Sequence, residues 1–214
     1  MTQLILPIEF DHCEYNPFDF VVTYSNLEGY KAITTNNPWP HGRLLIIGEE
    51  GSGKTHLATI WKHLHASVTI HSLDDYHKCN RSTHFVFDNI EFADEKEMCN
   101  ILNLAAENKQ QLLMTCGHYG EIYLPDLKSR LQSTYKILLK GPDENLTKIL
   151  ISKTLHDLQI KIHDDTLSYA ATRIHRSFKN IREFCYTLNH ISIQQKKPPS
   201  IQLAKKALAM VQEL

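Results

Sequence analysis

One short stretch limits what this chain can fold into more than any other. Residues Gly48 to Thr55 read Gly-Glu-Glu-Gly-Ser-Gly-Lys-Thr and match the phosphate-loop pattern G-x-x-x-x-G-K-[ST]. The apolar run Leu44–Ile47 before it predicts a buried strand, and His56–His65 after it predicts a helix. The sequence therefore predicts the strand–loop–helix unit in which such a loop binds phosphate.

The residue types in this loop suit the same chemistry. Its glycines let successive backbone N–H groups turn toward a phosphate, and the helix start adds partial positive charge. The residues expected to form this cradle are Gly48, Gly51, Ser52 and Gly53. Lys54 is expected to reach the β- and γ-phosphates of a nucleotide, and Thr55 to offer its hydroxyl to Mg²⁺. We expect Glu49 and Glu50 to face solvent, because the loop binds through its backbone.

A second segment completes this type of site. His84–Phe87 predicts a hydrophobic strand, and Asp88 follows it, where a carboxylate can hold Mg²⁺ through water. Many ATPases place an acidic residue next, but this chain has Asn89. An amide cannot accept a proton, so we expect hydrolysis by this chain alone to be slow. Glu91 could substitute, although it lies two residues beyond the usual position.

Two further segments have open interpretations. Thr115 ends a predicted strand that starts at Gln111, and its hydroxyl either senses a γ-phosphate or is a polar strand end. The apolar residues Phe20, Val21 and Val22 precede the loop and either wall an adenine pocket or pack in the core.

The order of predicted elements indicates the architecture. Strands alternate with helices up to a strand at Tyr135–Leu139, and Gly141-Pro142-Asp143 then marks a boundary. Beyond it we expect only helices, over residues 145–158, 164–175, 177–194 and 201–214. This pattern predicts an α/β core with a parallel sheet flanked by helices, followed by a small all-helical lid.

Composition excludes several classes of protein. The 214 residues carry a formal net charge of −1, so no overall basic field attracts nucleic acid, although a local basic patch stays open. No apolar run is long enough to span a bilayer, and no leader pattern opens the chain. Five scattered cysteines without zinc spacing, and dispersed histidines, argue against a metal enzyme and predict a cytoplasmic protein.

The first residues form a short apolar segment around Pro7, which favours an extended conformation. The segment either docks in a groove of another protein, with Gln3 as a hydrogen-bonding group, or covers this protein's own sheet. The residues expected to make the docking contacts are Gln3, Leu4, Leu6, Pro7 and Ile8.

Together these motifs resemble the AAA+ domain of the bacterial replication initiator DnaA. The resemblance rests on the phosphate loop, Phe87–Glu91, Leu113–Thr115, Leu124–Leu131 and Asn180–Glu183. Three features resemble the regulatory relative Hda more closely. The sequence ends after the lid, Asp-Asn replaces paired aspartates at Asp88-Asn89, and Gln3–Ile8 is similar to the Hda hexapeptide that binds the DNA polymerase III β sliding clamp.

The resemblance implies roles for individual residues. Gly48–Thr55 would be Walker A, Asp88 the Walker B aspartate and Thr115 sensor 1. Arg130 falls at the arginine finger and Arg182 at sensor 2. Phe20, Val21 and Val22 match the positions that line the adenine pocket, and Asn26 matches a family position whose role the sequence does not explain. The segment Gly117–Gly120 departs from the family pattern.

The resemblance also implies a function. The protein would bind ADP or ATP with Mg²⁺, sit on the DNA-loaded clamp and so meet DNA indirectly, and place Arg130 in the nucleotide site of DnaA. Initiation would thereby be switched off. The predicted domains are a clamp-binding peptide (1–10), the nucleotide-binding core (11–140) and the lid (141–214). Whether the chain forms a homodimer stays open.

Three other interpretations compete. An autonomous ATPase similar to DnaA or DnaC would load a helicase or remodel nucleic acid. A small-molecule P-loop kinase fits poorly with the helical lid. Arg130 could also be a surface arginine that pairs with Asp126 or the neighbouring lid.

Overall fold

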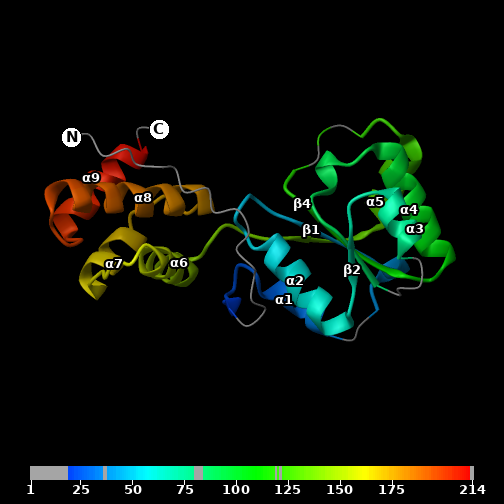
Figure 1. Cartoon of the computed structure of the whole chain (residues 1–214), viewed down its shortest axis with the longest axis horizontal. Coiled ribbons are helices and arrows are strands. Elements are labelled where there is room, and N and C mark those ends of the chain that lie inside the picture. Colours follow the sequence, from blue (N-terminus) through cyan, green and yellow to red (C-terminus); the bar gives the residue numbers. More distant parts are fainter. Residues whose placement is uncertain (1–18, 36–37, 80–83, 119, 121, 213–214) are drawn as a thin grey trace.

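The computed structural model describes residues 19–35, 38–79, 84–118, 120 and 122–212. The proposed clamp peptide, Gln3–Ile8, lies outside the described residues. The described chain forms an α/β part followed by four helices (Figure 1). No helix in these ranges is long and apolar enough to cross a membrane.

The α/β part contains a five-stranded sheet in which every pairing is parallel. Its strands are β1 (Arg43–Ile47), β2 (Val68–Ile70), β3 (His84–Phe87), β4 (Gln111–Cys116) and β5 (Tyr135–Leu138), in the spatial order β2-β3-β4-β1-β5. The central strands β1 and β4 are almost completely buried, as their apolar runs require. Because all strands run the same way, their carboxyl ends meet at one edge of the sheet, which we call the carboxyl edge.

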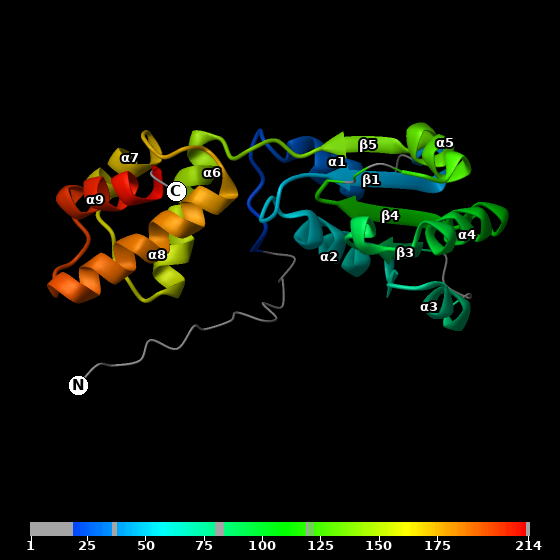
Figure 2. The ribbon, with the colours of Figure 1, turned by 90° about the horizontal axis from the view of Figure 1, so that it is seen from above.

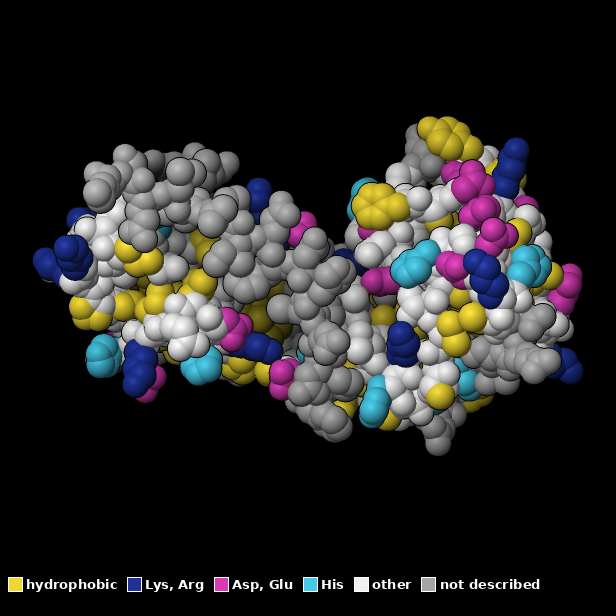
Figure 3. Space-filling view, in the orientation of Figure 1, with side chains coloured by type: hydrophobic (Ala, Val, Ile, Leu, Met, Phe, Trp, Pro, Cys, Tyr) yellow, Lys and Arg dark blue, Asp and Glu magenta, His cyan; other side chains and the backbone are white. Residues whose placement is uncertain are grey.

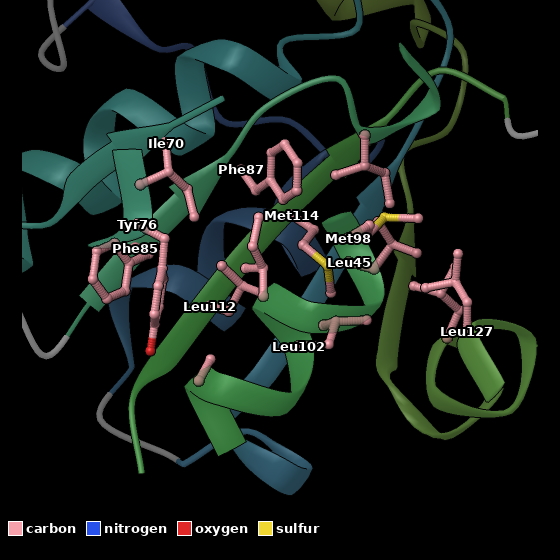
Figure 4. Close-up of a cluster of buried hydrophobic side chains, with 14 of the residues drawn as sticks. Leu45, Ile70, Tyr76, Phe85, Phe87, Met98, Leu102, Leu112, Met114 and Leu127 are labelled. Carbon is pink, nitrogen blue, oxygen red and sulfur yellow. The ribbon is translucent and has the colours of Figure 1, made fainter. Parts of the chain in front are cut away.

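Helices cover both faces of this sheet (Figure 1), and its strands lie side by side in Figure 2. The helical elements of this part are α1 (Leu27–Thr34), η2 (Pro40–Gly42), α2 (Lys54–His65), α3 (Leu73–Lys78), η3 (Ile90–Phe92), α4 (Glu95–Glu107) and α5 (Pro125–Ser133). α1 and α2 pack on one face through Ile33, Leu57 and Trp61. α3, α4 and α5 pack on the other, where Met98 and Leu127 contact the strands (Figure 4). The prediction of an α/β core with a flanked parallel sheet is confirmed.

The remaining helices build a separate hydrophobic cluster. They are α6 (Glu144–Asp157), α7 (Asp164–Ala171), α8 (Phe178–Gln195) and α9 (Ile201–Gln212). Asp143 caps α6 and Ser177 caps α8, each by accepting a backbone N–H in the first turn. The prediction of a helix to residue 175 is wrong, since α7 ends at Ala171. There the Thr172 hydroxyl donates to the Ser168 carbonyl at 3.0 Å, and the chain turns toward α8.

Candidate nucleotide site

The phosphate loop joins the carboxyl end of β1 to the start of α2. Gly51 and Gly53 have φ values of 81° and 91°, a left-handed conformation that glycine adopts without strain. A Cβ on Gly48 would lie 2.6 Å from the Ser52 hydroxyl oxygen. That hydroxyl is buried and has no hydrogen-bond partner within the described residues. A loop lined by glycines, with the Ser52 hydroxyl available as a hydrogen-bond donor, fits a phosphate group.

Lys54 lies inside this loop. The residue is 8% exposed, and Nζ donates to the carbonyl oxygens of Gly48 at 2.8 Å and of Glu49 at 3.0 Å. The ammonium group is therefore held where the backbone of the loop curves. Phosphate oxygens that enter the loop would meet this charge directly, which suits the role predicted for Lys54.

Asp88, the residue predicted for Walker B, also reaches the loop through Thr55. Thr55 donates its hydroxyl to Asp88 Oδ2 at 3.0 Å, so the two expected Mg²⁺-binding residues are in contact. Thr115, which is fully buried, donates to Asp88 Oδ1 and accepts the backbone N–H of Asn89 at 2.9 Å. The donor set of one hydroxyl and one carboxylate fits Mg²⁺. Thr115 thus orients Asp88, a contact that the sequence did not reveal.

Asn89 and Glu91 differ in where their polar groups lie. Asn89 has a φ of 55°, and its amide nitrogen lies 3.4 Å from Asp88 Oδ2. Glu91 Oε1 accepts the backbone N–H of Gly117 at 2.7 Å, whereas Oε2 is buried without a partner in the described chain. Burial, and then the Glu91 carboxylate, raise the pKa of the Cys116 thiol to about 12. That thiol therefore stays protonated beside the Glu91 carboxylate at the end of β4.

Two groups from outside the loop lie against its glycines. A Cβ on Gly53 would be 3.1 Å from the Phe20 ring, and one on Gly51 would be 3.3 Å from Arg182 Nη2 of α8. Phe20 also packs edge-on against His56, with ring centroids 5.0 Å apart. Arg182 Nη1 lies 3.4 Å from Glu50 Oε1, and Glu50 is exposed as predicted. The positions predicted for the base pocket and for sensor 2 therefore reach the loop from opposite ends of the chain.

The other residues of the predicted base pocket are more exposed. Val21 is half-buried, and Val22 is 39% exposed. Asn26 donates to the Val21 carbonyl at 2.9 Å and accepts the Thr23 N–H at 2.8 Å. Asn26 therefore fixes the turn that carries the pocket residues into α1. An asparagine just before a helix is the sequence signal for such a turn.

Arg130 lies far from this loop along the strands. The chain leaves β4 at the carboxyl edge and enters β5 at the opposite edge, so the last turn of α5, which holds Arg130, lies at the amino edge. Arg130 Nε pairs with Asp126 Oδ2 at 3.1 Å, as the competing interpretation expected. The Arg130 side chain is 30% exposed. Arg130 is therefore outside the protein's own phosphate site.

Comparisons with known proteins agree with this fold. No protein-family model matches the chain, and no curated protein matches it. Domain III of DnaA from Thermotoga maritima has a TM-score of 0.68 at 18% identity and covers 94% of this chain and 98% of that one. The chain has a DnaA-like AAA+ fold. AMPPCP-bound DnaA from Aquifex aeolicus has a TM-score of 0.62 at 14% identity, covering 87% of this chain and 68% of that one. The RuvB Holliday junction branch migration motor of Thermotoga maritima has a TM-score of 0.58 at 16% identity, covering 78% of this chain and 61% of that one.

Proposed function

We propose that this AAA+ protein is a nucleotide-bound regulator of replication initiation that docks on the sliding clamp and stimulates ATP hydrolysis by DnaA. The observation that carries the proposal is the separation of two half-sites. The loop, Thr55 and Asp88 form one at the carboxyl edge, and Arg130 forms the other at the amino edge. An arginine in that position can serve a neighbouring molecule's nucleotide but cannot reach its own.

The phosphate site supports nucleotide binding with little turnover. Lys54, the glycine cradle and the Ser52 hydroxyl, which has no partner among the described residues, suit phosphate, and Thr55 with Asp88 suits Mg²⁺. Asn89 supplies an amide where a base would orient water. DnaA structures that resemble this chain are bound to AMPPCP, which supports ADP or ATP as the ligand.

The chemistry of an arginine side chain supports the role proposed for Arg130. A guanidinium stabilises charge that develops on a γ-phosphate, and such a finger is worth about 10³–10⁵ in rate. Its ion pair with Asp126 is partly exposed, so it costs little to exchange for a phosphate. In this proposal Arg130 enters the nucleotide site of DnaA, and the DNA-loaded clamp brings the two proteins together.

The decisive experiment measures hydrolysis of ATP by DnaA, with and without the DNA-loaded clamp and this protein. We expect stimulation that requires both. Arg130→Ala should bind nucleotide and clamp normally yet lose the stimulation, whereas Lys128→Ala, which removes an exposed charge of the same helix, should keep it. Normal stimulation by Arg130→Ala would refute the finger.

Recruitment is tested separately. Replacing Gln3 and Leu6 together by alanine should abolish binding to the clamp, measured by surface plasmon resonance, while nucleotide binding remains. Unchanged clamp affinity would show that residues 1–10 are not a docking peptide.

One observation favours a second candidate, an autonomous ATPase that loads a helicase or remodels nucleic acid. Glu91 Oε2 is buried beside the site without a partner among the described residues, so this carboxylate could act as the base that Asn89 cannot supply. On the face in Figure 3, however, acidic side chains gather over the α/β part. Steady turnover without DnaA, lost in Glu91→Gln, would favour this candidate.

A further inference from the structure

Arg43, the first residue of β1, has an unusual environment for a cation. Its side chain lies in the protein, with only 6% of the residue exposed. Nε and Nη1 are both buried and have no hydrogen-bond partner within the described ranges. Burying a charge without a counter-ion is costly, and replacing such a charge by an apolar side chain is often neutral or stabilising. Folding alone therefore gives no reason for an arginine here.

The strand register shows what lies above this charge. Side chains alternate along β1, so Arg43 shares a face with Leu45. Leu45 belongs to the cluster that contains Leu127 and Leu131 of α5 (Figure 4). Leu44 pairs with Tyr135 at the start of β5, so Arg43, at the amino end of β1, lies beside residue 134, which directly follows the last turn of α5 with Arg130. Burial, and next the charge of Arg130, lower the pKa of Arg43, which supports this proximity.

On its solvent side, Arg130 faces a negative charge. Asp126, which is 61% exposed, accepts from Arg130 at 3.1 Å and from the Cys99 thiol at 3.1 Å through the same oxygen. The backbone of this turn is fixed, because Ser133 and Thr134 donate their hydroxyls to the Arg130 carbonyl. The Arg130 guanidinium thus contacts a shared carboxylate at the surface, and the turn that carries it adjoins the amino end of β1, where Arg43 is buried.

These charges act with unequal strength. Salt and water screen the exposed ion pair with Asp126, whereas a charge inside the protein is screened much less. Repulsion from Arg43 opposes any retreat of the guanidinium toward the sheet. Attraction from Asp126 is weak enough to be exchanged for an incoming phosphate.

We propose that Arg43 is a positioning residue that holds the Arg130 guanidinium at the surface by like-charge repulsion, ready to leave Asp126 for the phosphate of a partner's nucleotide. This inference rests on the proposed function, because it assumes that Arg130 acts on that nucleotide. Arg43 itself remains buried and touches no substrate.

The test compares Arg43→Met, which keeps most of the volume and removes the charge, with Arg43→Lys, which keeps the charge. In the clamp-dependent assay we expect Arg43→Met to lower the DnaA hydrolysis rate at saturation about 10-fold, a smaller loss than the roughly 100-fold that a 1 Å misplacement of a catalytic group can cause. The half-saturating concentration should not change, and Arg43→Lys should restore most of the rate. Lys136→Met, which removes an exposed cation from β5, is the matched control and should behave as the parent does.

Two readouts separate positioning from stability. The melting temperature of Arg43→Met should equal or exceed that of the parent, because a costly buried charge is gone. The ¹⁵N NMR signal of Arg130 Nε–H should shift in Arg43→Met and return toward the parent position in Arg43→Lys. An unchanged signal would overturn the proposal without any assay of DnaA.

The outcomes also distinguish failure of this inference from failure of the proposed function on which it rests. If Arg130→Ala loses stimulation while Arg43→Met keeps it, Arg43 has no positioning role and the finger stands. If Arg130→Ala keeps stimulation, the proposed function fails first. If Arg43→Met and the polar variant Arg43→Gln both fail to fold, Arg43 is a structural residue and the positioning role is refuted.

Discussion

The two edges of the sheet differ in how their charged side chains are paired. At the carboxyl edge, Lys54 and Asp88 are held by hydrogen bonds to the loop and to neighbouring hydroxyls. At the amino edge, Arg43 is buried, two of its nitrogens have no partner in the described chain, and His65 faces His84 with ring centroids 5.3 Å apart. The polar groups of the carboxyl edge surround a candidate anion site. Cationic and titratable side chains lie at the amino edge.

The topology explains this difference. In a parallel sheet with crossover helices, helices start at the carboxyl edge and end at the amino edge. Helix starts attract anions and helix ends attract cations, so a nucleotide belongs at the first edge and basic side chains at the second. His65 and Arg130 indeed lie in the last turns of α2 and α5. In the proposed function the protein binds its own nucleotide at one edge and presents a cation to a partner at the other.

Lys54→Ala tests the carboxyl edge and has the largest effect expected there. Losing a charged hydrogen-bond donor from a phosphate site costs about 1.5–3 kcal/mol, so we expect nucleotide affinity to fall roughly 100-fold. Titration with a fluorescent ADP analogue measures this loss. Lys62→Ala, at the far end of the same helix, is the control and should bind normally. Equal affinity of the two variants would place the nucleotide elsewhere.

Thr115→Val sharpens the comparison by removing one hydroxyl from the carboxyl edge. Asp88 would lose a donor, and the Asn89 N–H would lose its acceptor within the protein. An unsatisfied buried polar group costs about 1–3 kcal/mol, so the free energy of unfolding should fall by that amount in urea titrations. Mg²⁺-dependent nucleotide binding should weaken as well. A variant as stable as the parent would show that water replaces the hydroxyl.

The sequence predicted the elements that meet at the carboxyl edge because local patterns determine them. A strand, a glycine-rich turn and a helix follow one another over a few residues, and so do β3 and Asp88. The alternation of strands and helices likewise predicted the layers of the fold. These features depend on neighbours in the chain, and local periodicity and turn chemistry record them directly.

The missed contacts join residues that are distant in the sequence. Thr115 of β4 donates a hydrogen bond to Asp88, which follows the neighbouring strand β3. Glu91 accepts a hydrogen bond from the Gly117 N–H. No local pattern records such pairs, because strand order brings them together. The burial of Arg43 was missed for the same reason, since a charged residue before an apolar run is typical of a strand boundary. Tertiary packing on the face of β1 that Arg43 shares with Leu45 leaves only 6% of the residue exposed.

Acidification tests the amino edge through one residue, His84. Burial, and then the neighbouring His65, lower the pKa of His84, while a hydrogen bond with Gln111 acts in the opposite direction. The unfolded chain therefore binds a proton more readily than the folded one, so stability is lost as pH falls below about 6.5. His84→Phe, which keeps a ring against Trp61, should show a smaller fall in melting temperature between about pH 7.5 and 5.5. Its nucleotide affinity at neutral pH should match the parent, because the site lies at the other edge.

The smallest expected effect concerns the contact between the helical part and the loop. Arg182 and Glu50 are 52% and 92% exposed, and such pairs contribute about 0.2–1 kcal/mol at most. A double-mutant cycle with Arg182→Ala and Glu50→Ala should therefore give a small coupling in the free energy of unfolding, which salt reduces further. Arg182→Ala should still weaken ATP binding, because Nη2 lies against Gly51, whereas Glu50→Ala should not. If both variants weakened it equally, Arg182 would act through Glu50 and not on the nucleotide. The carboxyl edge would then be completed by the loop alone, without the helical part.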